Sequence, residues 1–210
     1  MEMMNSANTN NNADLVGTLA APPRFSHKGA NASGTETEYY TFPLEIARLS
    51  GATDVINIIA ARELLESAEL TSGGDKVAVL GEIRTYNNKS GEGAKLVISI
   101  LARELRITDE DERNVVALRG VLCKMPNIRR TPLGREICDL MLAVNRRYGR
   151  GDYIPCIAWG RTAEAASELT VGNSLALLGR MQSRKYNKAL ENGSGEERTA
   201  YEVSIVEFTE

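Results

Sequence analysis

The sequence predicts an all-β protein made of two similar halves, each a small barrel with one short helix. Three observations carry this prediction. Short fragments recur in the same order about 98–105 residues apart, each half has five segments of β-strand composition, and each half has one Ala/Glu/Leu-rich segment between its third and fourth strands. Because solenoid repeats are about 20–50 residues long, a period of this length indicates a duplicated domain.

The repeat is clearest in the fragment LeuGlyGluIleArg at 80–84, which matches LeuGlyArgMetGln at 178–182. At the same offset of 98 residues, the pair Arg48 and Asp54 aligns with Arg146 and Asp152. Further along, Tyr86-Asn87 parallels Tyr186-Asn187. Any one match could arise by chance, but their shared order indicates a duplication.

Both halves show the same order of predicted elements: three strands, a short helix and two more strands. In the first half, strands are expected at 14–19, 39–49, 54–60, 76–86 and 95–107, with the helix at 62–70. In the second half, strands are expected at 115–122, 136–147, 152–159, 174–186 and 199–208, with the helix at 162–169. This is the order of the OB fold, a five-stranded barrel whose strand 2–3 face and 1–2 and 4–5 loops bind oligonucleotides. The predicted fold class is therefore two tandem OB-fold barrels.

The domain boundaries follow from composition. The Asn-rich residues 1–12 are expected to be disordered, 13–108 to form a diverged OB fold, 109–113 to be a charged linker, and 114–210 to form the nucleic-acid-binding OB fold. Residues 114–210 hold 14 Lys and Arg against 11 Asp and Glu, a net charge of +3, whereas residues 1–113 hold 11 against 17, a net charge of −6. Such asymmetry is typical of a chain in which one half meets a polyanion, although two ordinary solvated surfaces could also differ this much.

A protein that binds single strands without reading sequence needs aromatic rings for base stacking and a basic groove for the phosphates. Tyr153 and Trp159 have the same parity on the third strand of the second half, so a continuous strand places them on one face. Ile154, Cys156 and Ala158 then face the core. The sequence leaves open whether Trp159 stacks on bases or fills the core. The candidate aromatic residues are Tyr148, Tyr153, Trp159 and Tyr186, and the candidate basic residues are Lys124, Arg129, Arg130, Arg146, Arg147, Arg161, Arg184 and Lys185.

Four motifs of the second half resemble the OB domain of bacterial single-stranded DNA-binding proteins. They are ThrProLeuGlyArgGlu at 131–136, LeuAlaValAsnArgArgTyr at 142–148, AspTyrIleProCysIleAlaTrpGlyArgThrAlaGlu at 152–164 and GlyArgMetGlnSerArgLysTyr at 179–186. The first begins with a predicted turn at 131–134. The resemblance is specific for 114–208 and weak for 13–107, where Val55 and Ala61 stand at the positions of Tyr153 and Trp159. In the first half, Tyr39 and Tyr40 are candidate replacement rings, whereas Phe42 is expected in the core.

The resemblance implies binding of single-stranded DNA in replication, recombination or repair, with no cofactor and no catalysis. It implies a bacterial, cytoplasmic, nucleoid-associated protein. Members with one OB fold form tetramers, so a tandem member is expected to form a homodimer that presents four OB folds. RNA is an alternative ligand, since stacking and phosphate contacts do not read the 2′-hydroxyl. The acidic tail that recruits partner proteins in this family has no counterpart before Glu210, which leaves the protein partners unknown.

Other functions find less support in the sequence. A protein-interaction scaffold, as in a primosome or a mobile-element accessory factor, is the alternative favoured by the acidic first half. No nucleophile elbow, phosphate-binding loop or HExxH motif is present, so we expect no enzyme. No apolar run has the length of a membrane helix. The residues Cys123, Cys138 and Cys156 lack metal-ligand spacing and are expected to be buried, and the single histidine, His27, is expected in a loop.

Overall fold

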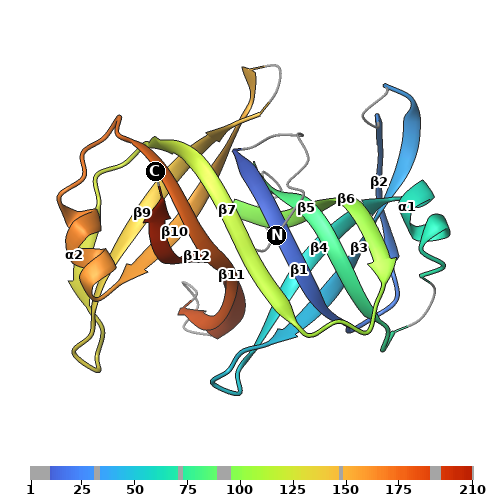
Figure 1. Ribbon diagram of the computed structural model, residues 1–210, viewed down its shortest axis with the longest axis horizontal. Helices are drawn as coiled ribbons and strands as arrows, with labels where there is room; N and C mark the ends of the chain where they lie inside the picture. The colour runs from blue at the N-terminus through green and yellow to red at the C-terminus, as the bar shows by residue number, and fades with distance from the viewer. Residues whose placement is uncertain are drawn as a thin grey trace. The chain divides into compact units, whose positions relative to one another are not determined.

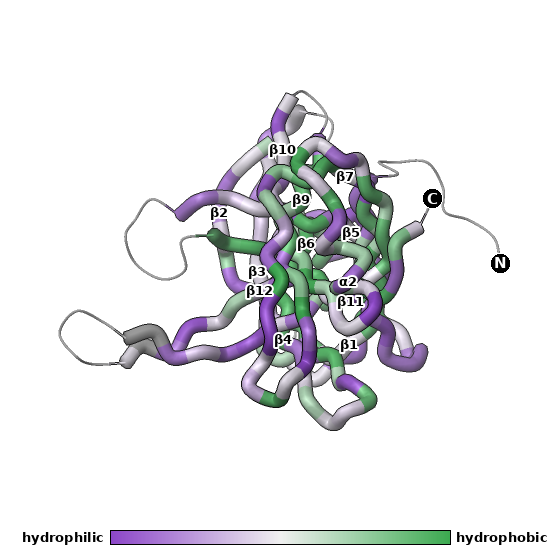
Figure 2. Tube along the Cα trace, turned by 90° about the vertical axis from the view of Figure 1, so that its left-hand side faces the viewer, coloured by the Kyte–Doolittle hydropathy of each residue, from purple (hydrophilic) through white to green (hydrophobic). Residues whose placement is uncertain are grey.

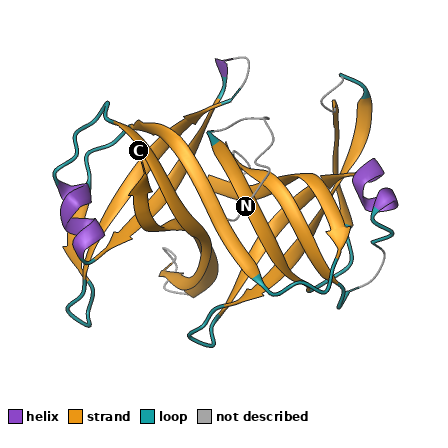
Figure 3. Cartoon of the chain, in the orientation of Figure 1, coloured by secondary structure: helices purple, strands orange, loops and turns teal. Residues whose placement is uncertain are grey.

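The computed structural model describes residues 10–30, 34–70, 73–88, 96–146, 149–189 and 195–209, apart from the side chains of residues 188, 189 and 196. Strands dominate, and two short α-helices accompany them (Figures 1 and 3). Contacts divide the chain into two units. Among the described residues, the first unit comprises those of Ala13–Asn114 and Met181–Glu202, and the second comprises 10–12, those of Val115–Arg180 and 203–209.

The first unit contains a closed five-stranded barrel. Its elements are β1 (Asn11–Leu19), β2 (Arg24–Ala30), β3 (Glu36–Ala47), β4 (Thr53–Ala61), α1 (Arg62–Ser67), β5 (Lys76–Asn87) and β6 (Leu96–Ile107). β1 pairs with β3 and β5, β3 with β4, β5 with β6, and β4 with β6 in parallel, which closes the ring. Full closure removes the exposed sheet edges that would otherwise pair with other chains.

The second unit repeats this ring. Its elements are β7 (Arg113–Leu122), β8 (Asn127–Arg130), β9 (Glu136–Asn145), β10 (Gly151–Trp159), α2 (Arg161–Ser167) and parts of β11 (Ser174–Ala189) and β12 (Gly195–Thr209). The end of β11 from Met181 and the start of β12 up to Glu202 belong to the first unit. β7 pairs with β9 and β11, β9 with β10, and β10 pairs in parallel with β12. The predicted order of strands and helix is confirmed in both halves. Two strands, β2 and β8, lie where the sequence analysis expected loops, and His27 lies on β2 instead of in a loop.

Alternation of side chains along the strands builds each core. In β4, Ile56, Ile58 and Ala60 are buried, and in β10 the equivalent Ile154, Cys156 and Ala158 are buried. Hydrophobic and hydrophilic residues accordingly intersperse along the strands (Figure 2). Phe42 is buried, as expected. The period of two in the sequence therefore predicts the inner face of each barrel correctly.

Glycines at equivalent positions of the two barrels allow strands to cross closely. A Cβ atom on Gly81 would lie 2.5 Å from the carbonyl oxygen of Leu101, and one on Gly179 would lie 2.7 Å from that of Ser204. No side chain fits at such distances, so these positions require glycine. The repeated glycine in the fragments at 80–84 and 178–182 thus has a steric cause.

Most of the predicted elements differ from the structure by a few residues at one end or both. Both helices end earlier than expected, at Ser67 and Ser167. After α1, Glu69 adopts a positive φ of 54° and closes the turn before the glycines are reached. Asn11 and Asn12, expected in a disordered N-terminus, begin β1.

The linker expected at 109–113 is tied to the first unit by its charges. Glu110 forms ion pairs with Arg106 and Arg113, and Arg113 also pairs with Asp14 at 2.9 Å. The backbone N–H of Ala47 donates to the carboxylate of Glu112. Hydrogen bonds from Arg106 and Arg113 hold the pKa of Glu110 below its usual value. The charge run is therefore a set of local contacts, and its last residue, Arg113, already belongs to β7.

Candidate nucleic-acid interface

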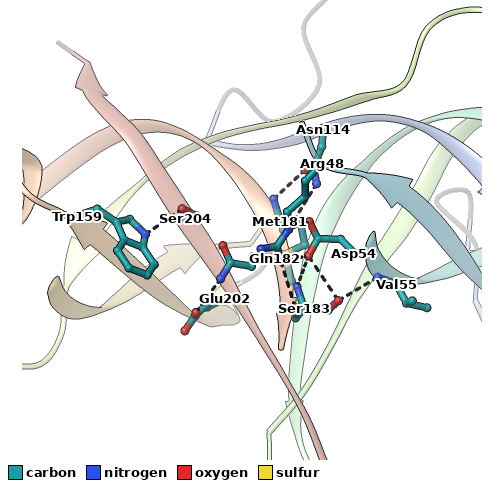
Figure 4. Close-up of polar contacts among 10 residues, drawn as sticks. All are labelled: Arg48, Asp54, Val55, Asn114, Trp159, Met181, Gln182, Ser183, Glu202 and Ser204. Carbon is teal, nitrogen blue, oxygen red and sulfur yellow. Dashed lines mark hydrogen bonds and ion pairs between the residues drawn. The ribbon is translucent and has the colours of Figure 1, made fainter. Parts of the chain in front are cut away.

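The outer face of β10 carries the two aromatic residues predicted from strand parity. The side chain of Tyr153 is 54% exposed, and Trp159 is half-buried. The indole N–H of Trp159 donates to Ser204 Oγ at 3.2 Å (Figure 4). This bond fixes one edge of the ring, so Trp159 is neither a fully buried core residue nor a freely rotating surface one. An exposed tyrosine and a fixed tryptophan on one strand can both offer a ring face to a base.

β8 and the turn after it present basic side chains that are already paired with acids. Arg129 donates through Nε to Asp139 at 2.6 Å, and Arg130 donates to Glu136 at 2.8 Å. Both arginines are exposed, as is Lys124 in the loop before β8. Exposed pairs of this kind are weak, so the arginines can exchange a carboxylate for a phosphate at small cost.

The predicted turn at 131–134 is confirmed. The N–H of Gly134 donates to the carbonyl oxygen of Thr131 at 2.8 Å, and Gly134 has a φ of +79°. Pro132 presets φ at the second position, and glycine accepts the left-handed φ at the fourth. The turn joins β8 to β9 and thereby orients the arginines of β8.

Arg146 has a structural position that the sequence interpretation did not foresee. Its guanidinium group donates through Nε to Asp152 at 2.6 Å, and the side chain of Asp152 is completely buried. Arg48 and Asp54 repeat this pair in the first unit. A cation that compensates a buried carboxylate is not available to a phosphate without cost. The other two candidates of this segment, Arg147 and Tyr148, lie outside the described residues.

The candidates on β11 belong to the part of that strand that packs with the first unit. The guanidinium carbon of Arg184 lies 5.7 Å from the centre of the Tyr186 ring, within cation–π range. Tyr186 is 36% exposed. Lys185 is exposed and pairs with Glu197 on β12 at 3.1 Å. Arg184 and Tyr186 thus share one face of β11 and form a basic–aromatic pair.

The remaining candidate, Arg161, is exposed at the start of α2. Its neighbour Gly160 has a positive φ of 53°, which turns the chain from β10 into the helix. Arg161 therefore follows Trp159 by two residues without belonging to the same strand.

In the first unit, other rings occupy the surface. Tyr86 is 57% exposed on β5. Phe25 packs edge-on against Tyr40 with ring centres 6.0 Å apart, and His27 stacks on Tyr39 at 5.0 Å. The pairs link β2 to β3, and sequence reasoning missed them because it assigned β2 to a loop.

The sequence analysis also did not predict a set of exposed apolar side chains between β7 and β9 of the second unit. Met125, Ile128 and Leu133 are all exposed there, although each lies among basic residues. The signal in the sequence is that these apolar residues stand in an otherwise polar segment before β9.

No group of His, Cys, Asp and Glu residues that could hold a metal is found among the described residues. Cys138 and Cys156 are buried, and Cys123 is half-buried. Burial raises the pKa of the Cys123 and Cys138 thiols. The described helices include none long and apolar enough to cross a membrane.

Residues 113–209 match the model of the Single-strand binding protein family. The match covers the second half of the chain, which is similar to this family.

Relatives of the family domain come from several bacteria. The single-stranded DNA-binding protein A of Bacillus subtilis is 37% identical over 106 residues, which are 46% of this chain and 59% of that protein. Single-stranded DNA-binding protein 2 of Listeria innocua is 39% identical over 80 residues, 35% of this chain and 50% of that protein. The chain thus spans about half the length of these curated relatives.

A solved structure extends the likeness to both units. The wild-type single-stranded DNA binding protein from Thermus aquaticus has a TM-score of 0.69 and 24% identity, and the match covers 95% of this chain and 91% of that one. At this identity the match shows the fold. The tandem OB architecture predicted from the repeat is therefore confirmed.

Proposed function

We propose that this protein binds single-stranded DNA without strong sequence preference, by stacking bases on aromatic rings and holding phosphates in a basic groove. The observation that carries the proposal is the outer face of β10, where exposed Tyr153 and half-buried Trp159 lie on one strand of a family OB domain. Every base has a π face, so stacking binds a strand whatever its sequence. The names of its bacterial relatives support the same ligand.

The basic residues complete the proposed site. Lys124, Arg129, Arg130 and Arg161 are exposed on the second unit, and Arg184 with Lys185 on β11 supply two more cations. The net charge of +3 for residues 114–210 favours a polyanion on this half. We assign no phosphate to Arg146, because it compensates Asp152.

In the cell, this binding would protect single strands during replication, recombination or repair in a bacterial cytoplasm. We further propose a homodimer, which would bring together four OB folds. RNA remains the alternative ligand, because no group described so far is placed to read a 2′-hydroxyl.

A second candidate is an OB scaffold that binds protein, and one observation favours it. In the first unit, the exposed ring of Phe25 packs edge-on against half-buried Tyr40 beside the acidic Glu38, and this half of the chain is acidic. An exposed ring beside a carboxylate suits a protein partner better than a polyanion. In cells, loss of complementation by a Tyr153→Ala, Tyr186→Ala double variant would count against this candidate.

Fluorescence of the single tryptophan tests the main proposal on the full chain. Oligo-dT should quench Trp159, and affinity should fall with salt with a log–log slope of about −0.7 per neutralised phosphate. Single-stranded RNA and duplex DNA of equal length serve as competitors. No binding of oligo-dT by fluorescence or by gel shift at low salt would refute the proposal.

A further inference from the structure

The segment Met181–Glu202 is encoded in the second half of the chain but packs with the first unit. It contains the end of β11 and the start of β12, and we call it the anchored hairpin. β11 pairs with β7 as far as Gly179. Beyond that residue, the edge of β11 needs other hydrogen-bond partners, because unpaired backbone groups are costly when shielded from water.

Side chains of the first unit supply those partners. The amide of Asn114 donates to the carbonyl oxygen of Met181 at 2.7 Å and accepts from its N–H at 2.8 Å. Two residues on, the N–H of Ser183 donates to Asp54 Oδ1 at 2.7 Å, and its carbonyl oxygen accepts from Arg48 at 3.2 Å. The Arg48–Asp54 pair therefore takes the place of a neighbouring strand (Figure 4).

Two further bonds join the hairpin to β4. The backbone N–H of Val55 donates to Ser183 Oγ at 2.9 Å. On the other strand of the hairpin, the hydroxyl of Tyr201 accepts from Asn57 Nδ2 at 3.3 Å. Burial raises the pKa of that hydroxyl, consistent with a packed position. Both strands of the hairpin are thus fixed to β4.

Fixing Ser183 also fixes the face that its neighbours present. Side chains alternate along a strand, so Arg184 and Tyr186 point away from the side on which Ser183 meets Asp54 and Val55. Both are exposed, and the guanidinium group of Arg184 lies over the ring of Tyr186. Asp54 itself is buried, with 1% of its side chain exposed, and cannot contact a ligand.

We propose that Asp54, held by Arg48, is a positioning residue for single-strand binding: it fixes Ser183 so that Arg184 and Tyr186 are presented to the nucleic acid. This inference rests on the proposed function. It gives the first OB fold a role in binding although Val55 and Ala61 stand where the second fold has Tyr153 and Trp159.

The test is a double-mutant cycle between Asp54→Asn and Tyr186→Ala in the full chain, with oligo-dT as the probe. Complete loss of one stacked base lowers affinity by about five- to 150-fold. Asp54→Asn displaces the ring without removing it, so it should weaken binding by a smaller factor, roughly three- to tenfold. In the Tyr186→Ala background the same change should cost less than about twofold, because the ring that it positions is gone. The salt slope should also become shallower by about 0.7 if Arg184 loses one phosphate.

Glu38→Gln is the matched control. It removes one carboxylate charge from the same unit, but its partners are Lys28, Arg62 and Tyr40. It should leave affinity within about twofold, as expected for an exposed pair. Where Asp54→Asn fails to fold, Tyr201→Phe removes one anchor without removing a charge and should show the same coupling to Tyr186→Ala on a smaller scale.

The outcomes separate the two proposals. If the wild-type protein does not bind oligo-dT, the proposed function fails and the positioning role fails with it. If the protein binds and Tyr186→Ala weakens binding, equal losses from Asp54→Asn in both backgrounds, or no loss in a folded variant, overturn the positioning role alone. A loss confined to the background that retains Tyr186 establishes it.

Discussion

The Nε atom of Arg146 donates a hydrogen bond to Oδ2 of Asp152 at 2.6 Å. Arg48 and Asp54 form the same bond at 2.7 Å in the first unit. The same pair therefore occurs at equivalent positions of the two barrels. Its presence in both indicates a role in the fold.

Arg146→Ala is predicted to destabilise the protein by about 3 kcal/mol, the lower end for a broken buried pair, because Asp152 would stay buried without its cation. Urea unfolding measures the change. Arg150→Ala is the control, since it removes an equal charge from an exposed side chain and should cost less than about 0.5 kcal/mol. An Arg146→Ala protein that is as stable as the wild type but binds oligo-dT more weakly would instead indicate that Arg146 contacts a phosphate.

Tyr153→Ala is predicted to lower the affinity for oligo-dT by about 1–3 kcal/mol, the contribution of one stacked base. Tyr153→Phe should retain most of the affinity, because the ring face remains. The salt slope should stay unchanged, since no cation is lost. Leu49→Ala, at an exposed turn of the first unit, is the control for loss of an exposed apolar side chain; equal losses at both positions would speak against stacking.

Asp139→Asn is predicted to strengthen binding to oligo-dT by about twofold to fivefold, because it removes a carboxylate that competes with phosphate for Arg129. The salt slope should steepen by about 0.7. Glu207→Gln removes the same charge from an exposed position on β12 and controls for net charge. If both variants gain equally, the effect comes from the overall field and Arg129 has no special part.

Gly179→Ala is predicted to destabilise the second barrel by about 1–3 kcal/mol, because its Cβ would lie 2.7 Å from both the Ser204 carbonyl oxygen and a Val203 methyl carbon. Gly195→Ala is the control, as nothing lies within 4 Å of a Cβ there. Thermal unfolding of the two variants gives the comparison. A Gly179→Ala protein as stable as the wild type would show that β11 and β12 can separate at this crossing.

The three thiols are predicted to react slowly with a thiol reagent at pH 7. Burial raises the pKa of Cys123 and Cys138, which lowers the fraction of reactive thiolate. Cys123 is half-buried and should react first, before Cys138 and Cys156. Denaturant should make all three react alike; fast labelling of Cys156 in the native protein would contradict its burial.

Local patterns in the sequence were sufficient for the barrels. The alternation in β4 and β10 predicts which residues face inward, and the repeat predicts that both halves share one order of elements. The turn at 131–134 was readable because proline and glycine restrict φ at known positions. Such features depend on neighbours along the chain.

Features that depend on distant residues were not readable. The bond between Asp54 and Ser183 joins residues 129 positions apart, and no local sequence pattern predicts it. The basic residues around Arg146 indicate a phosphate contact, but its partner in the structure is Asp152, six residues later. Arg48 and Asp54 have the same spacing in the first half. That repeated spacing was the signal that sequence reasoning could have used. β2 and β8 were missed because turn-forming residues surround both strands.

The anchored hairpin also bears on how the protein is made. During synthesis the first barrel emerges before residues 183 and 201 have been added to the chain. The hydrogen bond from the Ser183 N–H to Asp54 can therefore form only later. At ~5–20 residues per second, that interval lasts several seconds. The nascent first barrel therefore lacks contacts that only the later segment Met181–Glu202 supplies. A ribosome that stalls before residue 183 would leave Val55 and Asp54 of β4 without their hydrogen bonds to Ser183.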